Sequence, residues 1–144
     1  MTLRRNLRPA VLAAMLALPG AALATTQAQV NETLRTTPAI YNGLFTAGLV
    51  KHVVDSCPDL QGPNRFQRTT YFLGLFNQAR GLGFSRAQIQ AFVDDRDEQR
   101  QLRRVGYSHL ERQGVDPRNQ DAVCTWARQQ MSARTGIGPS LRER

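Results

Sequence analysis

Apolar residues recur at intervals of three and four positions over most of the chain beyond residue 37, which is the spacing of one face of an α-helix. This pattern predicts helices over residues 38–56, 65–81, 86–114 and 117–136. No segment shows the alternation of apolar and polar residues that would predict a strand instead. We therefore expect an all-α fold, a small bundle of four to five helices, because the third segment can form one helix or two.

Each predicted helix begins with a residue that favours a helix N-terminus. Thr37 and Asp116 are both followed by proline, whose missing amide costs nothing in the first turn, and Asn64 precedes the second helix. Ser85 with Gln88 three residues later forms a capping box at the start of the third helix. These local signals place the helix starts more firmly than the helix ends.

An eight-residue polar run, residues 94–101, interrupts the apolar pattern of the third helix. A helix that continues through it would cross solvent, supported by pairs such as Asp97 with Arg100 or with Gln101. Alternatively the helix breaks within the run and restarts before Leu102. Of the two, we expect the continuous helix.

The first 24 residues have the organisation of a secretory signal peptide: three arginines among the first eight residues, an apolar run over residues 10–18, and small residues at Ala22 and Ala24. We expect cleavage after Ala24 and a periplasmic or secreted mature chain. The apolar run has about half of the roughly 20 residues that a membrane-spanning helix needs. Stable membrane insertion is therefore not expected after cleavage.

The mature chain of 120 residues is expected to be one domain. Residues 25–36 are polar and lack periodicity apart from Val30 and Leu34, so they are predicted to be a flexible lead-in to a single helical domain over residues 37–144. Of the 144 residues of the whole chain, 41% are hydrophobic and 21% charged, which excludes collagen-like and low-complexity classes. Signal removal leaves 16 basic and 11 acidic residues, a net charge of +5.

The chain has two cysteines, Cys57 and Cys124, separated by 67 residues. An even number of cysteines in an exported chain predicts a disulfide, and only one pairing is possible. Each cysteine falls on the apolar stripe of its helix, so both thiols are expected to point inward. The bond would join the first predicted helix to the last.

The chain resembles an uncharacterised family of small exported alphaproteobacterial proteins, domain of unknown function 5333, over most of its mature length. The resemblance rests on the segments 79–84 and 91–95, on the two widely spaced cysteines and on the glycine-containing tail after Thr135. These motifs are architectural, so the resemblance implies no catalytic residue and no ligand.

Four acidic residues of the polar run, Asp94, Asp95, Asp97 and Glu98, offer oxygen ligands to a hard cation. A calcium loop places its ligands at alternating positions around a glycine, whereas arginines stand among these acids. We interpret the group as a solvated, self-paired helix face rather than as a metal site.

Two histidines lie near carboxylates in the sequence, His52 near Asp55 and His109 near Glu111, as a general base and its orienting group would. The sequence places no serine or cysteine nucleophile beside either, and the spacing of a zinc protease is absent. We predict no catalytic residue, no cofactor and no metal ligand. Hydrolysis through His52 is the least favoured of the functions considered.

Six aromatic residues supply most of the aromatic surface, and at helical spacing in a small chain they are interpreted as core rather than as a lipid or cofactor pocket. They are Phe66, Tyr71, Phe72, Phe76, Phe84 and Trp126. Five arginines of the third helix are predicted to form a basic strip that faces solvent or a partner. They are Arg96, Arg100, Arg103, Arg104 and Arg112.

These features favour a non-enzymatic protein that binds another protein of the cell envelope, as an inhibitor, an immunity-type antagonist or an accessory factor. The alternative is an envelope stress or acid chaperone that exposes apolar helices when conditions change. Nucleic acid is not an expected partner, because the chain is exported and acids accompany the basic strip. The sequence carries no signal for an oligomeric state.

Overall fold

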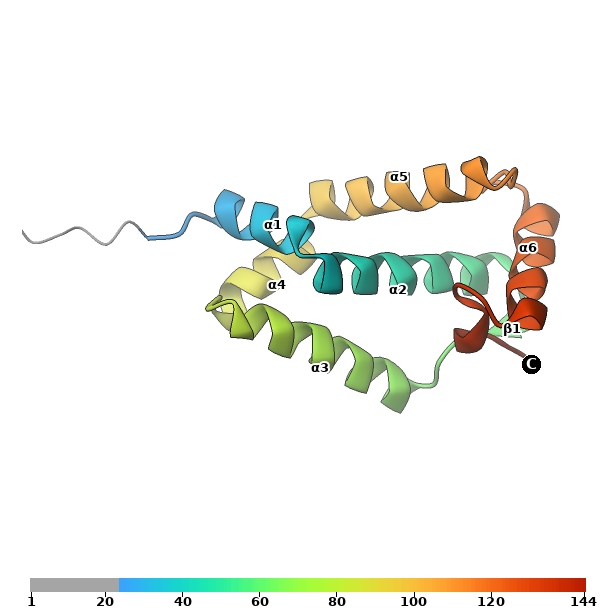
Figure 1. Ribbon diagram of the computed structural model, residues 1–144, viewed down its shortest axis with the longest axis horizontal. Helices are drawn as coiled ribbons and strands as arrows, with labels where there is room; N and C mark the ends of the chain where they lie inside the picture. The colour runs from blue at the N-terminus through green and yellow to red at the C-terminus, as the bar shows by residue number, and fades with distance from the viewer. Residues whose placement is uncertain (1–23) are drawn as a thin grey trace, which may run out of the picture.

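In a computed structural model that describes residues 24–144, the chain forms six α-helices, a short 3₁₀ helix and two short strands (Figure 1). The predicted signal peptide falls on residues 1–23 and Ala24, and so lies almost wholly outside the described residues. The α-helices are α1 (Gln27–Thr36), α2 (Pro38–Ser56), α3 (Arg65–Gly81), α4 (Arg86–Asp94), α5 (Arg96–Arg112) and α6 (Gln120–Ala133). The short elements are β1 (Leu60–Gln61), η1 (Gly138–Ser140) and β2 (Arg142–Glu143).

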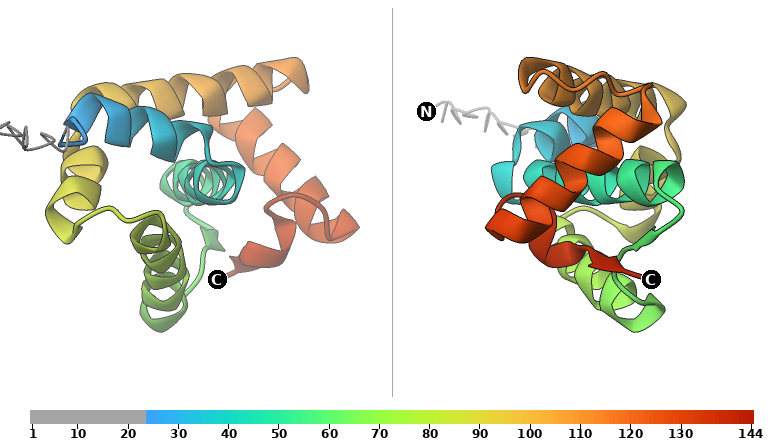
Figure 2. Two further views of the ribbon diagram at one scale, coloured as in Figure 1. Left: turned by 60° about the vertical axis from the view of Figure 1, so that its left-hand side comes forward. Right: turned by 90° about the vertical axis from the view of Figure 1, so that its right-hand side faces the viewer.

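α2 is the central element of the fold and packs against α1, α3, α5 and α6 (Figure 1). α5 runs along one side of α2 and α3 along the other, while α1 and α4 lie together at one end. α6 crosses α2 diagonally at the opposite end, as the right-hand view of Figure 2 shows. The fold is therefore organised around one helix with different neighbours at its two ends.

The hydrophobic core is divided into two clusters along α2. One combines Val53 with Leu110 of α5 and Val123 of α6, all fully buried. The other lies at the start of α2 and contains Val30 and Leu34 of α1, packed with residues of α4. α2 links the two clusters into one domain.

The structure confirms the all-α class and several of the local predictions. The helix predicted over residues 38–56 agrees with α2 at both ends. Asn64 caps α3, which ends at Gly81 as expected. The Ser85 hydroxyl accepts a hydrogen bond from the backbone amide of Gln88 at 3.2 Å. The side-chain oxygen of Gln88 accepts one from the backbone amide of Ser85 at 2.8 Å, which completes the capping box.

The expected count of four to five helices is wrong, because a helix forms where a flexible lead-in over residues 25–36 was expected. α1 is capped by Thr26, whose hydroxyl accepts from the Gln29 amide, and this capping box was overlooked in the sequence. Val30 and Leu34, one turn apart, are fully buried against neighbouring helices. A helix of ten residues is marginal alone, so this packing is what stabilises it.

The expected continuous third helix is also wrong: it breaks at Asp95 into α4 and α5. Asp95 has an extended backbone, and its carboxylate accepts hydrogen bonds from the amides of Asp97 and Glu98. The Gln99 side chain donates to the carbonyl of Val93, which has lost its helical partner. An aspartate that caps the following segment in this way competes with helix continuation.

The last helix begins later than predicted. Asp116 and Pro117 form a turn, in which the Asp116 carboxylate accepts from the Arg118 amide, and the cap of α6 is Asn119. The segment after α6 is not a free tail. Its Ile137 and Leu141 are buried, and β2 pairs antiparallel with β1, with Leu60 opposite Glu143. The fold therefore contains a minimal β pairing that the apolar pattern did not indicate.

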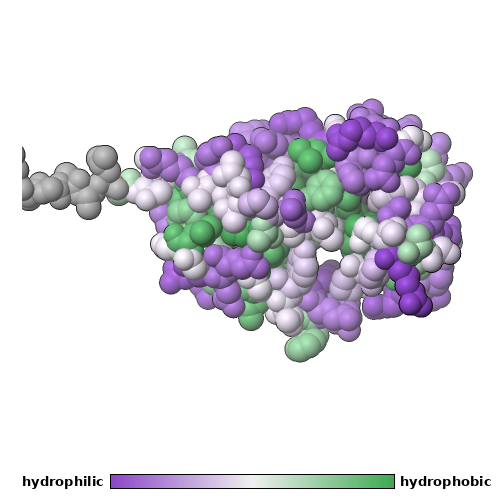
Figure 3. Space-filling view, in the orientation of Figure 1, coloured by the Kyte–Doolittle hydropathy of each residue, from purple (hydrophilic) through white to green (hydrophobic). Residues whose placement is uncertain are grey.

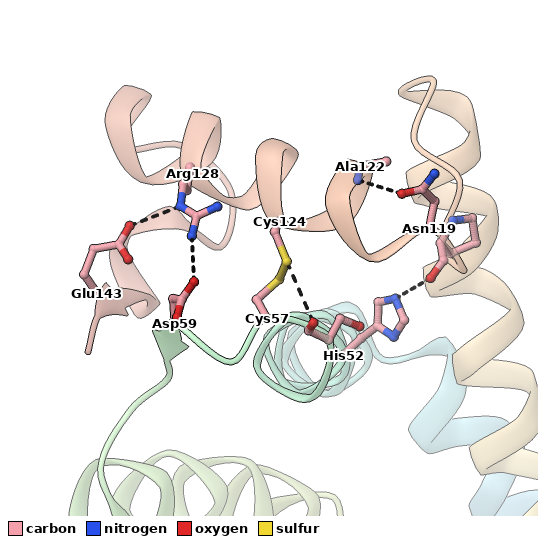
Figure 4. Close-up of a disulfide and its surroundings, with 10 residues drawn as sticks. His52, Cys57, Asp59, Asn119, Ala122, Cys124, Arg128 and Glu143 are labelled. Carbon is pink, nitrogen blue, oxygen red and sulfur yellow. Dashed lines mark hydrogen bonds and ion pairs between the residues drawn. A yellow bond between two sulfur atoms is a disulfide. The ribbon is translucent and has the colours of Figure 1, made fainter.

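The Cys57–Cys124 disulfide is confirmed, with the two Cα atoms 5.7 Å apart (Figure 4). Both cysteines are buried, as predicted. The bond joins the residue that follows α2 to α6; the helix over residues 38–56, predicted to be the first, is the second because α1 precedes it. Beside it, Arg128 of α6 forms ion pairs with Asp59 and Glu143.

Candidate functional site

The carboxylates of the acidic run are each engaged in a structural contact. Asp95 caps α5, and its pKa is lowered because the amides of Glu98 and Asp97 donate to the charged carboxylate. Asp97 pairs with Arg100, as predicted, and Glu98 forms an ion pair with Arg35 of α1. Within residues 24–144, no group of three or more candidate ligands is placed to hold a metal ion.

The two histidines do not pair with the carboxylates that lie near them in the sequence. His52 makes a 3.0 Å hydrogen bond with the Pro117 carbonyl, and Asp55 pairs instead with Lys51. The His109 ring packs edge-on against the ring of Phe45 and forms a hydrogen bond with the Gln113 side chain. Burial, with a further contribution from Arg112, lowers the pKa of His109. Both histidines therefore lie in packed contacts between elements.

The five arginines of the predicted basic strip all lie exposed on α5. Arg96, Arg100 and Arg103 follow the four- and three-residue spacing of one helix face, with Arg104 beside them. Arg112 lies two turns further along α5. The strip is thus solvent-facing, and its role toward a partner stays a prediction.

The aromatic residues divide into a buried group and an exposed group. Phe84 and Trp126 are buried, and Phe76 is partly buried. Phe66, Tyr71 and Phe72 are exposed on α3, so their assignment to the core is wrong. Phe66 is 79% exposed and Phe72 is 46% exposed. Figure 3 shows hydrophobic atoms at the lower edge of the molecule, where Figure 1 places α3.

α3 contacts the rest of the fold through few buried residues. Of its 17 residues only Leu75 and Ala79 are buried. Gly43 of α2 allows the close approach, since a Cβ at this position would lie 2.5 Å from a methyl carbon of Leu75. The Tyr71 hydroxyl donates to the Gly43 carbonyl at 2.9 Å, and partial burial raises the pKa of Tyr71. On the side of α3 toward α4, Phe76 is partly buried, whereas Phe66, Phe72 and Leu73 are exposed.

A shallow groove lies in the angle between α3 and α4. Its large apolar side chains, Phe72, Leu73 and Phe76, come from α3, and Ala87 of α4 also lines it. Its charged side chains are Arg65, Arg68 and Arg86, and the guanidinium of Arg86 lies 5.5 Å from the centre of the Phe76 ring. We call the three large apolar residues and the three arginines, together with the neighbouring exposed Phe66, the α3 face.

The charged residues of the α3 face are all positive. From residue 60 to residue 93 the chain contains four arginines and no aspartate or glutamate. None of the groove arginines forms an ion pair within the described residues. The face thus combines exposed aromatic surface with uncompensated positive charge.

The α3 face differs from the predicted core, although two signals for it are present in the sequence. The apolar residues of α3 occupy more than one side of the helix, which is more than a single buried stripe needs. The absence of acids around them was the second signal. Neither signal says which apolar residues stay exposed, because that depends on the packing of α2 and α4.

Comparison with known proteins confirms the family resemblance. The model of a family described as "Family of unknown function (DUF5333)" matches residues 32–142, from within α1 to the start of β2. No curated protein and no solved structure matches the chain. Within residues 24–144, no helix has the length and hydrophobicity needed to cross a membrane.

Proposed function

We propose that this chain, which belongs to the DUF5333 family of unknown function, is an exported, non-enzymatic protein that binds another protein of the cell envelope. The observation that carries the proposal is the α3 face, where Phe66, Phe72 and Leu73 are exposed together. Contiguous apolar surface on a small domain is typical of an interaction site. Aromatic and arginine side chains are the residues that dominate the binding energy of protein interfaces.

The position of α3 favours a preformed binding surface. Tyr71 and Leu75 fix the helix against α2 at Gly43, while Phe66 and Leu73, on the opposite side of α3, stay exposed. A partner would therefore not have to order the helix before it binds. Such preorganisation reduces the entropic cost of association.

Two features support the exported location. The N-terminal segment has the organisation of a signal peptide. The Cys57–Cys124 disulfide is of a kind that persists outside the reducing cytosol. The proposed partner is accordingly another envelope protein.

Site-specific photo-crosslinking tests the proposal. The chain, with its own N-terminal segment, is expressed in its native cells with p-benzoylphenylalanine in place of Leu73, which is 54% exposed on α3. The matched control carries the same group in place of Thr125, which is exposed on α6. We expect one dominant crosslinked protein from position 73 and none from position 125. Mass spectrometry of the product also reports whether the mature chain starts at Thr25.

A double variant separates binding from folding. Phe66→Ser with Leu73→Ser removes exposed apolar groups, so stability should change by no more than about 0.5 kcal/mol per site. The crosslink to the partner, now recorded from position 69, should be lost. The same crosslinked protein from positions 73 and 125, or an unchanged crosslink in the double variant, would contradict the proposal. Many products that form only at low pH would favour the chaperone alternative.

A further inference from the structure

We propose that the segment bound by the α3 face is an acidic amphipathic helix of the partner protein, seated in the groove between α3 and α4. This inference rests on the proposed function above and specifies the chemistry of the partner. It is carried by the arrangement of Arg65, Arg68 and Arg86 around Phe72 and Phe76.

The groove lacks acidic side chains that would balance its arginines. The three arginines are exposed and make no ion pair within the described residues, and residues 60–93 contain no acid. The nearest carboxylate along α4 is that of Asp94, about 12 Å along the helix from Arg86, and it accepts hydrogen bonds from Gln90. Glutamates or aspartates of a partner would supply the missing countercharges, with charge-assisted hydrogen bonds to the guanidinium groups.

These arginines do not stabilise their own helices. Arg65 and Arg68 lie in or next to the first turn of α3, and Arg86 opens α4. The positive end of the helix dipole disfavours cations there, and neither helix has an acidic residue in its first turn. A partner carboxylate would be attracted both by the guanidinium groups and by these helix ends.

The length of the groove fits a short helix. The groove follows α3 from Arg65 to Phe76, which is 11 residues or about 16 Å of helix. This length matches about three turns of a bound helix, whose apolar side chains at three- and four-residue spacing would contact Phe72, Leu73 and Phe76. Arginines stand on both walls, so the carboxylates are expected on both flanks of the apolar stripe of the partner.

The surface is better suited to a protein helix than to a lipid bilayer. The exposed apolar side chains lie in a shallow depression between two helices, next to arginines from both helices. Thr69 and Gln90 also line the groove. The Thr69 hydroxyl and the Gln90 side-chain oxygen would lack partners against hydrocarbon, while the side chains of a bound helix can hydrogen-bond to them.

A peptide-display selection on the mature, disulfide-bonded protein tests the inference. The library consists of 18-residue helical peptides whose apolar stripe varies among Leu, Ile, Val and Phe, and whose flanking positions vary among Glu, Gln and Lys. We expect Glu to be enriched at the flanks, and the selected peptides to bind at least tenfold more tightly than their Gln counterparts. The affinity should fall as salt concentration rises.

Two charge-reversed variants provide the matched comparison. Arg65→Glu with Arg68→Glu and Arg86→Glu should reverse the selection, so that Lys is enriched. Because glutamate is favoured near helix N-termini, this variant is expected to fold. The control is Arg103→Glu with Arg104→Glu and Arg112→Glu on α5, which makes the same change in net charge outside the groove. It should continue to select Glu.

The outcomes separate this inference from the proposed function. If peptides bind with no preference among flanking charges, and Leu73→Ser abolishes their binding, the docking face stands and the acidic partner is overturned. Binding to phosphatidylglycerol vesicles that depends on the groove arginines, without peptide binding, would assign the face to a lipid surface instead. If neither peptides nor vesicles bind, the inference is overturned, while a crosslink at position 73 would still support the proposed function.

Discussion

Reduction of the Cys57–Cys124 disulfide should remove a large part of the stability of the domain. The bond closes a loop of 67 residues. In the chain-entropy treatment, a loop of this length disfavours the unfolded chain by about 4 kcal/mol at 25 °C. The total stability of a domain of this size is typically 5–15 kcal/mol. The reduced protein should therefore be only marginally folded.

The assay compares urea unfolding of the oxidised protein with that of protein refolded in the presence of a reductant. Because Cys57 is 1% exposed, the reductant should reach the bond only after the protein opens, and the rate of reduction should follow the rate of unfolding. The matched control is Cys57→Ala with Cys124→Ala, whose unfolding should not respond to reductant. A difference below about 1 kcal/mol between the oxidised and reduced proteins would refute the loop argument, since it would mean that the bond scarcely restricts the unfolded chain.

Three further predictions test other parts of the fold. Gly138→Ala should destabilise the C-terminal segment by about 1–3 kcal/mol, since its Cβ would lie 2.0 Å from the carbonyl oxygen of Gln130, and hydrogen exchange of that segment would report it. Leu34→Ala should cost about 2–5 kcal/mol in urea unfolding, because Leu34 is fully buried on α1. Acidification should lower stability in two steps, because the pKa of His109 and that of Asp95 are both lowered in the folded state. Each group then binds protons more readily in the unfolded chain, so the stability present at neutral pH falls below about pH 6.5 for His109 and below about pH 4 for Asp95.

Matched variants act as controls for these three predictions. Gly74→Ala should not destabilise the protein, because no atom lies within 4 Å of the added Cβ. Thr33→Ala, at an exposed position of α1, should change stability by no more than about 0.5 kcal/mol. His109→Asn should abolish the fall in stability between pH 7 and pH 5.5. Persistence of that fall in the variant would assign it to another group.

The helix starts that were predicted correctly depend on interactions between residues close in sequence. The Ser85–Gln88 capping box and the Asn64 cap are completed within four residues, so the sequence alone contains all the groups that form them. The pairing of Cys57 with Cys124 was predictable for a different reason, because only two cysteines are present.

The errors in the predicted fold arise where a distant segment decides the local structure. α1 is stabilised by burial of Val30 and Leu34 against other helices, which its mostly polar sequence does not reveal. The break at Asp95 joins two helices with different neighbours, since α4 packs on α1 and α5 packs on α2. An Asn31 amide from α1 also donates to the Asp95 carboxylate. Local pattern therefore left the choice between a continuous and a broken helix open.

The candidate site depends on tertiary structure more than the fold does. The residue types of α3 were evident in the sequence, and the aromatic positions among them were assigned to the core. Only the packing of α3 on α2 through Leu75 and Ala79 leaves Phe66, Phe72 and Leu73 exposed. It is likewise α4 that brings Arg86 to the same groove as Arg65, 21 positions earlier.

The sequence by itself thus determined the helical class, the starts of α2, α3 and α4, the disulfide and the family. The tertiary structure decided which apolar residues are buried and which charges lie together. The physical reason is the range of the interactions: caps and helical hydrogen bonds join residues within about four positions of each other. Burial and surface charge depend on whichever segments, near or far in the chain, are packed against a given side chain.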